Sequence, residues 1–311
     1  MNANNTGALG LGIDAGGTQT RWALADAGGE IVGQGSVAGL SALEMGSDAG
    51  RQRIRQTLGE LAHAVRASGR PLRIHAGLTG FSEGGDTLRA LVAESFGLID
   101  NEVVLGSDIE IACLDLFKPG EGIVVYAGTG SIAAFIDARG QFHRAGGRGV
   151  ILDDAGGGFW IAREALKHIW RAEDEQPGCW ERSPLAVSVF KRIGGSDWAS
   201  TREFVYGGNS SASRGEIGKL ALAVAEVAEV DAVAQEILNE AGRELARLAR
   251  AMIQRYGPRP VALAGRVAQL HPSIEKSMRL ALPLSTQLTV RNSEAHHAAA
   301  RIAARQTRNI A

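Results

Sequence analysis

The chain of 311 residues is about twice as long as a typical domain, so its length favours two domains over one small module. Its 45% hydrophobic and 22% charged residues match globular averages and argue against a disordered or fibrous chain. A formal net charge of -1 gives no basic field for nucleic acid or an anionic membrane. Glycine is the outlier, at 41 positions, which indicates many places where the backbone must be bare.

Cysteine usage and the absence of long apolar runs point to a cytoplasmic protein. Cys113 and Cys179 are too few for a disulfide framework and lack the CxxC spacing of a zinc or redox site. The first 13 residues have neither the basic nor the apolar segment of a secretory signal. The longest uncharged apolar stretch, 122–136, is shorter than the ~20 residues that a membrane-spanning helix needs. We therefore expect small-molecule partners, with no nucleic acid and no membrane.

The N-terminal third predicts a meander of three strands followed by alternating helices and strands. An apolar strand from Leu9 leads into Asp-Ala-Gly-Gly-Thr at 14–18, and a second strand and an Asp-Ala-Gly-Gly turn follow at 21–25 and 26–29. The other elements expected here are a strand at 30–33, a helix at 48–68, a strand at 72–77, a helix at 86–96, a strand at 102–105 and a helix at 109–117.

The same meander recurs at 123–142. A strand at 123–126 leads into Ala-Gly-Thr-Gly-Ser at 127–131, and a strand at 133–136 precedes an Asp-Ala-Arg-Gly turn and a short strand at 141–142. Gly16 and Gly128 are 128 − 16 = 112 positions apart, and Asp26 and Asp137 are 137 − 26 = 111 apart. One residue of slippage therefore aligns both pairs of turns, and an internal duplication explains the pattern.

The second half is longer and more helical than the first. Helices are expected at 159–170, 185–192, 216–227, 231–256 and 293–305, and strands at 261–264 and 287–290. This order predicts an α/β architecture in two similar halves with mixed sheets. We place the domains at 1–117 and 118–292, with the terminal helix at 293–311 packing back onto the first.

The two glycine turns admit two interpretations. They could be tight hairpin turns, or their bare amides could converge on an anion such as a polyphosphate. No GxxxxGK[ST] motif is present, because Gly218-Lys219 is followed by Leu220. Gly10-x-Gly12-x-x-Ala15 fits a dinucleotide fingerprint only superficially, since a strand and not a helix is expected to follow. The duplication favours the anion-binding interpretation.

At these motifs the chain resembles the actin-like ATPase and sugar-kinase superfamily, and within it the BadF/BadG-type branch that contains N-acetylglucosamine kinase and bacterial glucosamine kinase. The resemblance lies in 12–18, 127–131, 146–158 and 264–267. It implies two duplicated actin-like ATPase (ribonuclease H-like) domains with a cleft between them. The ATP-binding residues that it implies are Gly16, Gly17, Thr18, Gly128, Thr129, Gly130, Ser131 and Gly265.

The resemblance also assigns two carboxylates. Asp108, at the end of a strand in Gly106-Ser107-Asp108, corresponds to the family's general base and would also contact the substrate. From the residues alone, Asp108 could equally cap the following helix, as could Ser107. Asp14 corresponds to a Mg²⁺ site, with contact through water, although an Asx turn would explain it as well.

The sugar-binding residues implied by the resemblance are Ser41, Asp108, Gly147, Arg148 and Asp154. Two positions depart from the family's pattern: Ser41 replaces an Asn that often binds the sugar, and Arg148 is typical of glucosamine kinases where N-acetylglucosamine kinases have Trp. A surface turn would also explain Asp154. The function implied is phosphorylation of N-acetylglucosamine or glucosamine at O6 by MgATP. A homodimer is left open.

The alternative from another class is an ATP-hydrolysing activator of a dehydratase or reductase, as in the BadF type. Such activators hold an iron–sulfur cluster with paired cysteines, and this chain offers only Cys113, expected to be buried, and Cys179. His296 and His297 lack a Cys or carboxylate at ligand spacing, and we expect them on a solvated helix face rather than in a metal site.

Overall fold

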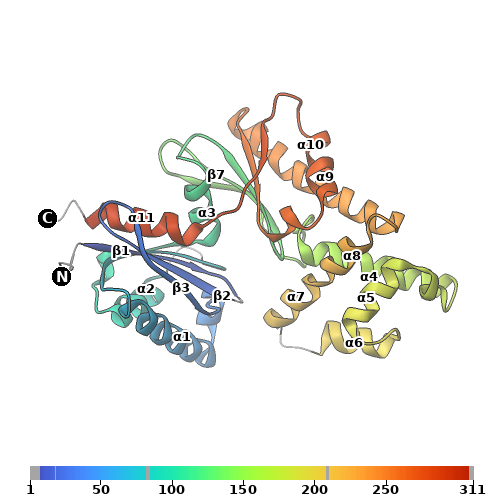
Figure 1. Ribbon diagram of the computed structural model, residues 1–311, viewed down its shortest axis with the longest axis horizontal. Coiled ribbons are helices and arrows are strands. Elements are labelled where there is room, and N and C mark those ends of the chain that lie inside the picture. The colour runs from blue at the N-terminus through green and yellow to red at the C-terminus, as the bar shows by residue number, and fades with distance from the viewer. Residues whose placement is uncertain (1–7, 18, 82–84, 208–209, 308–311) are drawn as a thin grey trace, which may run out of the picture. The chain divides into compact units, whose positions relative to one another are not determined.

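A computed structural model describes residues 8–17, 19–81, 85–207 and 210–307, with only the backbone described at 210–213. The chain divides into two compact units (Figure 1). Unit 1 comprises Met1–Lys118 and Ser293–Ala311, and unit 2 comprises Pro119–Asn292. None of the helices within the described residues is long and apolar enough to cross a membrane.

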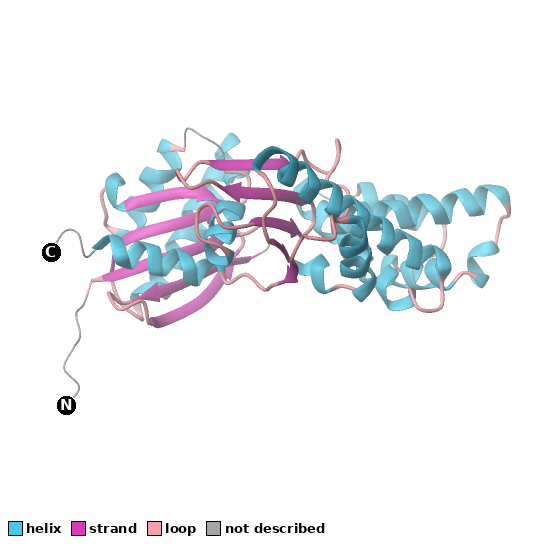
Figure 2. Cartoon of the chain, turned by 90° about the horizontal axis from the view of Figure 1, so that it is seen from above, coloured by secondary structure: helices cyan, strands magenta, loops and turns pink. Residues whose placement is uncertain are grey.

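Unit 1 is built on a five-stranded mixed sheet in the order β3-β2-β1-β4-β5. The strands, drawn in magenta in Figure 2, are β1 (Leu9–Ala15), β2 (Gln19–Ala25), β3 (Ile31–Ala38), β4 (Pro71–Leu78) and β5 (Val103–Ser107). The pairs β1–β2 and β2–β3 are antiparallel, whereas β1–β4 and β4–β5 are parallel. The carboxyl ends of β1, β4 and β5 therefore meet at one edge of the sheet.

Helices cover both faces of this sheet. On one face, α1 (Asp48–Arg66) and α2 (Asp86–Phe96) bury the apolar residues of β1, β2, β4 and β5, and two short 3-10 turns, η1 (Ala42–Gly46) and η2 (Asp100–Glu102), lie between these elements. On the other face, α11 (Ala295–Thr307) lies along β1, next to α3 (Asp108–Leu116). Gly10 and Gly12 permit this contact, because a Cβ there would lie 2.0 and 2.1 Å from backbone atoms of α11. These glycines serve strand–helix packing, and as expected they do not open a helix.

Unit 2 repeats the sheet of unit 1. Its strands are β6 (Ile123–Ala127), β7 (Ser131–Ile136), β8 (Phe142–Gly146), β9 (Val261–Ala264) and β10 (Leu288–Val290). Their order is β10-β9-β6-β7-β8, and β6–β7 and β7–β8 are antiparallel while β6–β9 and β9–β10 are parallel. Strands β6, β7, β8, β9 and β10 thus occupy the same positions in this sheet as β1, β2, β3, β4 and β5 occupy in the sheet of unit 1. The predicted α/β architecture with two similar mixed sheets is confirmed.

The helices of unit 2 depart from expectation in three places. The helices of unit 2 are α4 (Gly158–Glu175), α5 (Pro184–Ile193), α6 (Trp198–Tyr206), α7 (Ser210–Gly218), α8 (Leu220–Val227), α9 (Ala232–Tyr256) and α10 (Pro272–Ala281), with 3-10 turns η3 (Cys179–Arg182) and η4 (Arg266–Gln269). The sequence did not predict α6 or α10. The single helix expected at 216–227 is wrong, because the chain turns at Lys219, where Gly218 packs against Gly158 at the start of α4.

The duplicated Asp turns have the same hydrogen bonds. In each copy, Oδ1 of Asp26 or Asp137 accepts from the amides two and four residues later, at 2.8 and 3.0 Å. The third residue after each aspartate, Gly29 or Gly140, has a positive φ of 92° or 80°. These glycines are needed because other residues rarely adopt that conformation.

The one-residue slippage lies in the glycine turns. The last pair of residues before the first turn is Ala15 and Thr20, which have four residues between them. The last pair before the second turn is Ala127 and Ser131, which have three residues between them. The first glycine turn is therefore one residue longer than the second.

Candidate active site

Unit 1 brings two of the predicted carboxylates to the edge where its parallel strands end. Asp14 is next to last in β1, and Asp108 begins α3 directly after β5. In the sheet, Asp14 pairs with Gly77 of β4 and Gly77 with Gly106 of β5. A Cβ on Gly77 would lie 3.1 Å from the Asp108 Cα atom, so glycine lets α3 begin close over the sheet.

Asp108 is half-buried and is held by two hydrogen bonds. Thr79 Oγ1 donates to Oδ2 at 2.6 Å, and the Ile109 amide donates to Oδ1 at 2.9 Å. The N-cap of α3 is Ser107, whose Oγ accepts from the Glu110 amide at 3.1 Å. The capping role that the sequence left open thus falls to Ser107, and the Asp108 carboxylate is oriented without being needed as the cap.

Asp14 carries a carboxylate whose charge is poorly compensated. Burial, followed by repulsion from Asp108, raises the pKa of Asp14 to about 6, while Arg21 on the neighbouring strand opposes the shift. A cation placed here would favour the ionised form. No group of three His, Cys, Asp or Glu residues suited to a metal occurs in the described part of the chain. A cation bound by Asp14 would therefore take its other ligands from phosphate or water, as Mg²⁺ commonly does.

The glycine turn of unit 1 is open. The Gly16 amide donates to the Gln19 carbonyl at 3.0 Å, which closes the hairpin. Gly17 is exposed, its φ is not positive, and a Cβ there would have no atom within 4 Å. Thr18 lies outside the described residues. Nothing in the described fold requires glycine at position 17. Contact between its backbone and a ligand would be a reason for glycine there.

Ser41 lies next to this edge, but its hydroxyl already has partners. Ser41 Oγ donates to the Thr79 carbonyl at 3.2 Å and accepts from the Leu43 amide at 3.3 Å, and the residue is 8% exposed. The structure therefore brings Ser41 into the chain of contacts that leads through Thr79 to Asp108. It also gives the Ser41 hydroxyl a structural role as the cap of η1.

The glycine turn of unit 2 is covered by the start of α4. The amides of Gly158 and Phe159 donate to the carbonyls of Gly128 and Thr129 at 2.8 and 2.9 Å. The Gly128 amide closes the turn onto the Gly130 carbonyl at 2.9 Å. Within the described ranges no acceptor is assigned to the amides of Thr129 and Gly130, and these two are the groups that a phosphate could meet.

Close approaches explain the glycines around this turn. A Cβ on Gly130 would lie 2.2 Å from Asp154 Oδ2, and one on Gly157 would lie 2.6 Å from the Gly130 carbonyl carbon. A Cβ on Gly265, which has a φ of 95°, would lie 2.4 Å from the Ala127 carbonyl oxygen. Ser131 Oγ donates to the Ala155 carbonyl at 2.6 Å, so its hydroxyl is occupied within the fold.

Asp154 closes the predicted sugar segment. Its Oδ1 accepts from the Gly149 amide at 3.0 Å, and the pKa of Asp154 is raised chiefly by burial. With a φ of 52° it is a non-glycine residue in the left-handed region, a strain that is often found at functional sites. Gly147, with a φ of 62°, donates its amide to the Ser131 carbonyl at 3.0 Å, which ties the segment to the glycine turn. The Arg148 side chain is exposed.

Sequence reasoning missed Thr79. It directly follows β4, and the pairing of Leu78 with Ser107 places Thr79 beside Asp108. The rule that carboxyl ends of parallel strands gather functional side chains could have found it.

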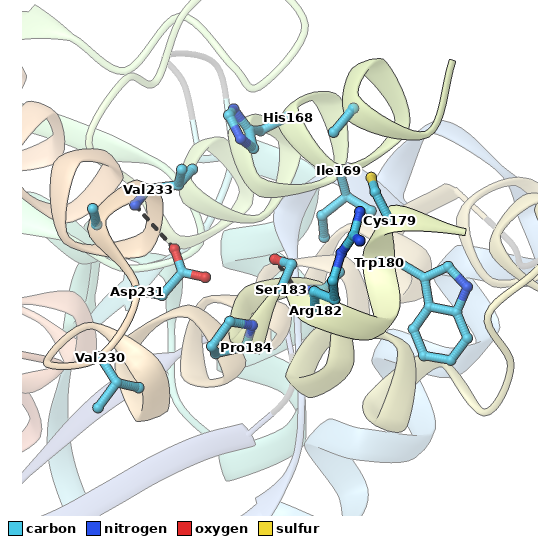
Figure 3. A pocket seen from close by; sticks show the side chains of 13 residues that line it. His168, Ile169, Cys179, Trp180, Arg182, Ser183, Pro184, Val230, Asp231 and Val233 are labelled. Carbon is cyan, nitrogen blue, oxygen red and sulfur yellow. Dashed lines mark hydrogen bonds between the residues drawn. The ribbon is translucent and has the colours of Figure 1, made fainter. Parts of the chain in front are cut away.

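A pocket of about 330 Å³ in unit 2 contains none of the predicted site residues (Figure 3). It lies among α4, η3, α5 and the start of α9. Its buried carboxylate, Asp231, has structural partners: Oδ1 accepts from the Val233 and Ala234 amides and Oδ2 from the Leu185 amide. Asp231 thus joins the starts of two helices, and this pocket is separate from the predicted site residues.

The comparisons with solved structures agree with this fold. A candidate N-acetylglucosamine kinase of Chromobacterium violaceum is 24% identical, with 96% of this chain and 99% of that one covered and a TM-score of 0.71. A candidate N-acetylglucosamine kinase of Porphyromonas gingivalis is 19% identical, with 98% and 100% covered and a TM-score of 0.74. A glucokinase of the ROK family from Streptomyces griseus, solved with glucose and AMPPNP, is 17% identical, with 96% and 99% covered and a TM-score of 0.60.

Curated relatives match part of the chain. An N-acetylmuramic acid/N-acetylglucosamine kinase of Clostridium acetobutylicum is 29% identical over 154 residues, 49% of each chain. An N-acetyl-D-glucosamine kinase of Dictyostelium discoideum is 25% identical over 177 residues, 53% of this chain and 55% of that one. The matches thus span about half the length of these relatives. A family model covers much more, at residues 11–280. The chain belongs to the BadF/BadG/BcrA/BcrD ATPase family.

Proposed function

We propose that the chain is an ATP-dependent kinase that phosphorylates the 6-hydroxyl of an amino sugar, with N-acetylglucosamine or glucosamine as acceptor. The observation that carries the proposal is the Asp108 carboxylate, which is oriented at a strand end and is not the cap of its helix. Family membership supports the use of ATP. The names of two partly matched relatives support an N-acetylated sugar as acceptor.

Asp108 acts as the general base in this proposal. As the sugar oxygen attacks the terminal phosphorus of ATP, its proton passes to the Asp108 carboxylate and ADP leaves. A positioned base of this kind contributes roughly 10²- to 10⁴-fold to the rate. The bond from Thr79 to Oδ2 occupies one lone pair, so the carboxylate retains acceptor sites for the hydroxyl.

Asp14 is the proposed holder of magnesium, directly or through water. Its burial beside Asp108, which raises its pKa to about 6, suits it to a bound cation. When bound, the ion would neutralise negative charge on the phosphate oxygens of ATP. The amides of Gly17 in unit 1 and of Thr129 and Gly130 in unit 2 are the proposed phosphate donors, with Gly16, Gly128 and Ser131 shaping the turns. Thr18 is a further proposed ATP-binding residue.

Asp154, Gly147, Arg148 and Ser41 are the proposed sugar contacts, and Gly265 is the proposed adenosine contact. The clostridial relative is also named for N-acetylmuramic acid, which differs from N-acetylglucosamine by a lactyl group that bears a carboxylate. The exposed guanidinium of Arg148 would attract that carboxylate. N-acetylmuramic acid is therefore a second candidate acceptor.

The properties of the two cysteines favour the kinase over the alternative function, an ATP-hydrolysing activator with an iron–sulfur cluster. Cys113 is 4% exposed, as expected, and burial raises the pKa of its thiol to about 12. The Cys179 thiol is hydrogen-bonded to Glu173, which raises its pKa as well. Because cluster ligation needs accessible thiolates, the buried Cys113 is poorly suited to an iron–sulfur cluster. Two free cysteines fit the reducing cytoplasm, where we place the reaction.

An ADP-release assay tests the proposal. Purified protein with MgATP would be offered glucosamine, N-acetylglucosamine, N-acetylmannosamine, N-acetylmuramic acid and glucose, with phosphorus NMR to locate the new ester. We expect turnover with an amino sugar and a 6-phosphate product, and no turnover with any of the five would count against the kinase.

The role of Arg148 is tested in the same assay. Arg148→Gln is expected to reduce turnover of N-acetylmuramic acid more than that of N-acetylglucosamine. Arg139→Gln, on the exposed hairpin turn of the same unit, is the matched control.

A further inference from the structure

Thr79 occupies a junction of three segments of unit 1. Its amide donates to the Ala15 carbonyl at the end of β1 at 2.9 Å, and its carbonyl accepts from the Ala42 amide at 3.0 Å. Its carbonyl also accepts from Ser41 Oγ at 3.2 Å. The Thr79 backbone is therefore fixed between the strand that carries Asp14 and the segment that carries Ser41.

The side chain of Thr79 extends this junction to Asp108. Thr79 Oγ1 donates to Asp108 Oδ2 at 2.6 Å, a short hydrogen bond of the charge-assisted kind. Threonine is branched at Cβ and therefore stiff at χ1, so a fixed backbone gives a fixed direction to its hydroxyl. The other Asp108 oxygen accepts from the Ile109 amide at 2.9 Å. One donor on each oxygen fixes the plane of the carboxylate.

The structure of α3 does not account for the Thr79 bond. Ser107 already caps the helix through the Glu110 amide, and the Ile109 amide is bonded to the other Asp108 oxygen. The threonine hydroxyl therefore satisfies no orphan backbone group of the helix, and what it restrains is the direction of the Asp108 carboxylate.

We propose that Thr79 is a positioning residue for the reaction: its hydroxyl holds the Asp108 carboxylate in the orientation in which it accepts the sugar proton. Through the contacts of its backbone, the same residue sets the distance of that carboxylate from the end of β1 and from Ser41. This inference rests on the proposed function, because it assigns a role toward Asp108 as the base.

The test compares three variants in the kinase assay. Thr79→Val keeps the shape of the side chain and removes the donor, and we expect kcat to fall about 10- to 100-fold, as for a misdirected catalytic group, with KM for ATP unchanged. Thr79→Ser keeps the hydroxyl and should restore most of the lost turnover. Thr307→Val is the matched control, because Thr307 Oγ1 also makes a 2.6 Å hydrogen bond, to the Ala304 carbonyl in α11, and it should keep wild-type kcat.

The outcomes separate this inference from the proposed function. If Asp108→Asn abolishes turnover while Thr79→Val keeps wild-type kcat, the positioning role is overturned and the kinase stands. If Thr79→Ser is as slow as Thr79→Val, the hydroxyl is not what matters and the role is again overturned. If Asp108→Asn itself keeps wild-type turnover, the proposed base falls and the role of Thr79 falls with it. Should Thr79→Val fail to fold, as judged by circular dichroism, Thr79→Ala replaces it under the same criteria.

Discussion

The two glycine turns share a sequence pattern but are packed in opposite ways. In unit 2, the start of α4 bonds the carbonyls of Gly128 and Thr129, and Gly157 sits so close to Gly130 that a Cβ would not fit. In unit 1, Gly17 is exposed, and a Cβ there would have no atom within 4 Å among the described residues outside its chain neighbours. Glycine is thus required by the protein's own packing at position 130 in the second turn and is unexplained by packing at position 17 in the first.

The charges differ in the same way. At the end of β1, burial and then repulsion from Asp108 raise the pKa of Asp14, and Asp108 begins a helix that Ser107 caps. In unit 2, Asp154 is buried and bonded to the Gly149 amide. The charge of the Asp14 carboxylate is thus poorly compensated, whereas the Asp154 carboxylate is held by a hydrogen bond within the fold. Substitutions at Gly17 and Asp108 should therefore change function more than stability, whereas substitution of Gly157 should lower stability.

The largest expected effect is on turnover. Asp108→Asn keeps the shape of the side chain and removes the base, so kcat should fall by at least ~10²-fold with ATP affinity largely kept. Steady-state kinetics and ATP titration would measure both. Asp115→Asn, in the same helix, tests whether any lost charge has this effect. A variant that turns over near the wild-type rate would remove Asp108 as the base.

Much of the fold could be predicted from the sequence. The alternation and spacing of apolar residues gave both meanders, and the Asp-Ala-x-Gly turns aligned the two copies. Local patterns failed where a helix buries little. Within α6 only Thr201 is fully buried, so this helix lacks the apolar stripe that a prediction needs. By contrast, α10 places its buried Ile274 and Met278 four residues apart on one face, a pattern that the prediction overlooked.

The site could be predicted only in part. The glycine turns and the strand-end carboxylates are local features, whereas Thr79 meets Asp108 through the register of β4 and β5, across 29 residues. The surroundings of the histidines of α11 also could not be predicted from local sequence. They are not on a solvated face as expected: His297 bonds Glu294 and Gln34, and burial lowers the pKa of His296 to about 4. Both results come from packing between distant segments.

A pair of glycine substitutions tests the difference between the turns directly. Gly157→Ala puts a methyl group within 2.6–2.8 Å of Gly130 backbone atoms, although its φ of -80° suits any residue. It should lower the free energy of unfolding by roughly 1–3 kcal/mol, the usual cost of overpacking. Gly17→Ala should leave that free energy within about 0.5 kcal/mol and raise KM for ATP. Denaturant unfolding and kinetics would check both, and a reversal of the stability order would refute the contrast.

Acid should destabilise unit 1 through His75. Burial lowers the pKa of His75 to about 4, and its Nδ1 atom has no hydrogen-bond partner among the described residues. Below about pH 6.5 the unfolded chain binds this proton while the folded chain does not until pH falls near 4, so stability should be lost across that window. At pH 5 the loss is about 2 kcal/mol. Denaturant unfolding at pH 7 and pH 5 should show that His75→Leu removes this part of the pH dependence. His143→Gln, whose ring is paired with Asp137 in unit 2, should retain it.

At Asp14 we expect a gain in stability together with a loss of function. Because the pKa of Asp14 is raised to about 6, its ionised form destabilises the fold at neutral pH, and this cost is lost as pH falls toward the ordinary carboxyl range. Asp14→Asn should raise the free energy of unfolding of the metal-free protein by about 1–2 kcal/mol and abolish turnover. With ATP present, Mg²⁺ should raise the melting temperature of the wild type and leave that of Asp14→Asn unchanged. Equal stabilisation of both proteins would show that the cation binds elsewhere, and the contrast in charge between the units would then have no link to the metal.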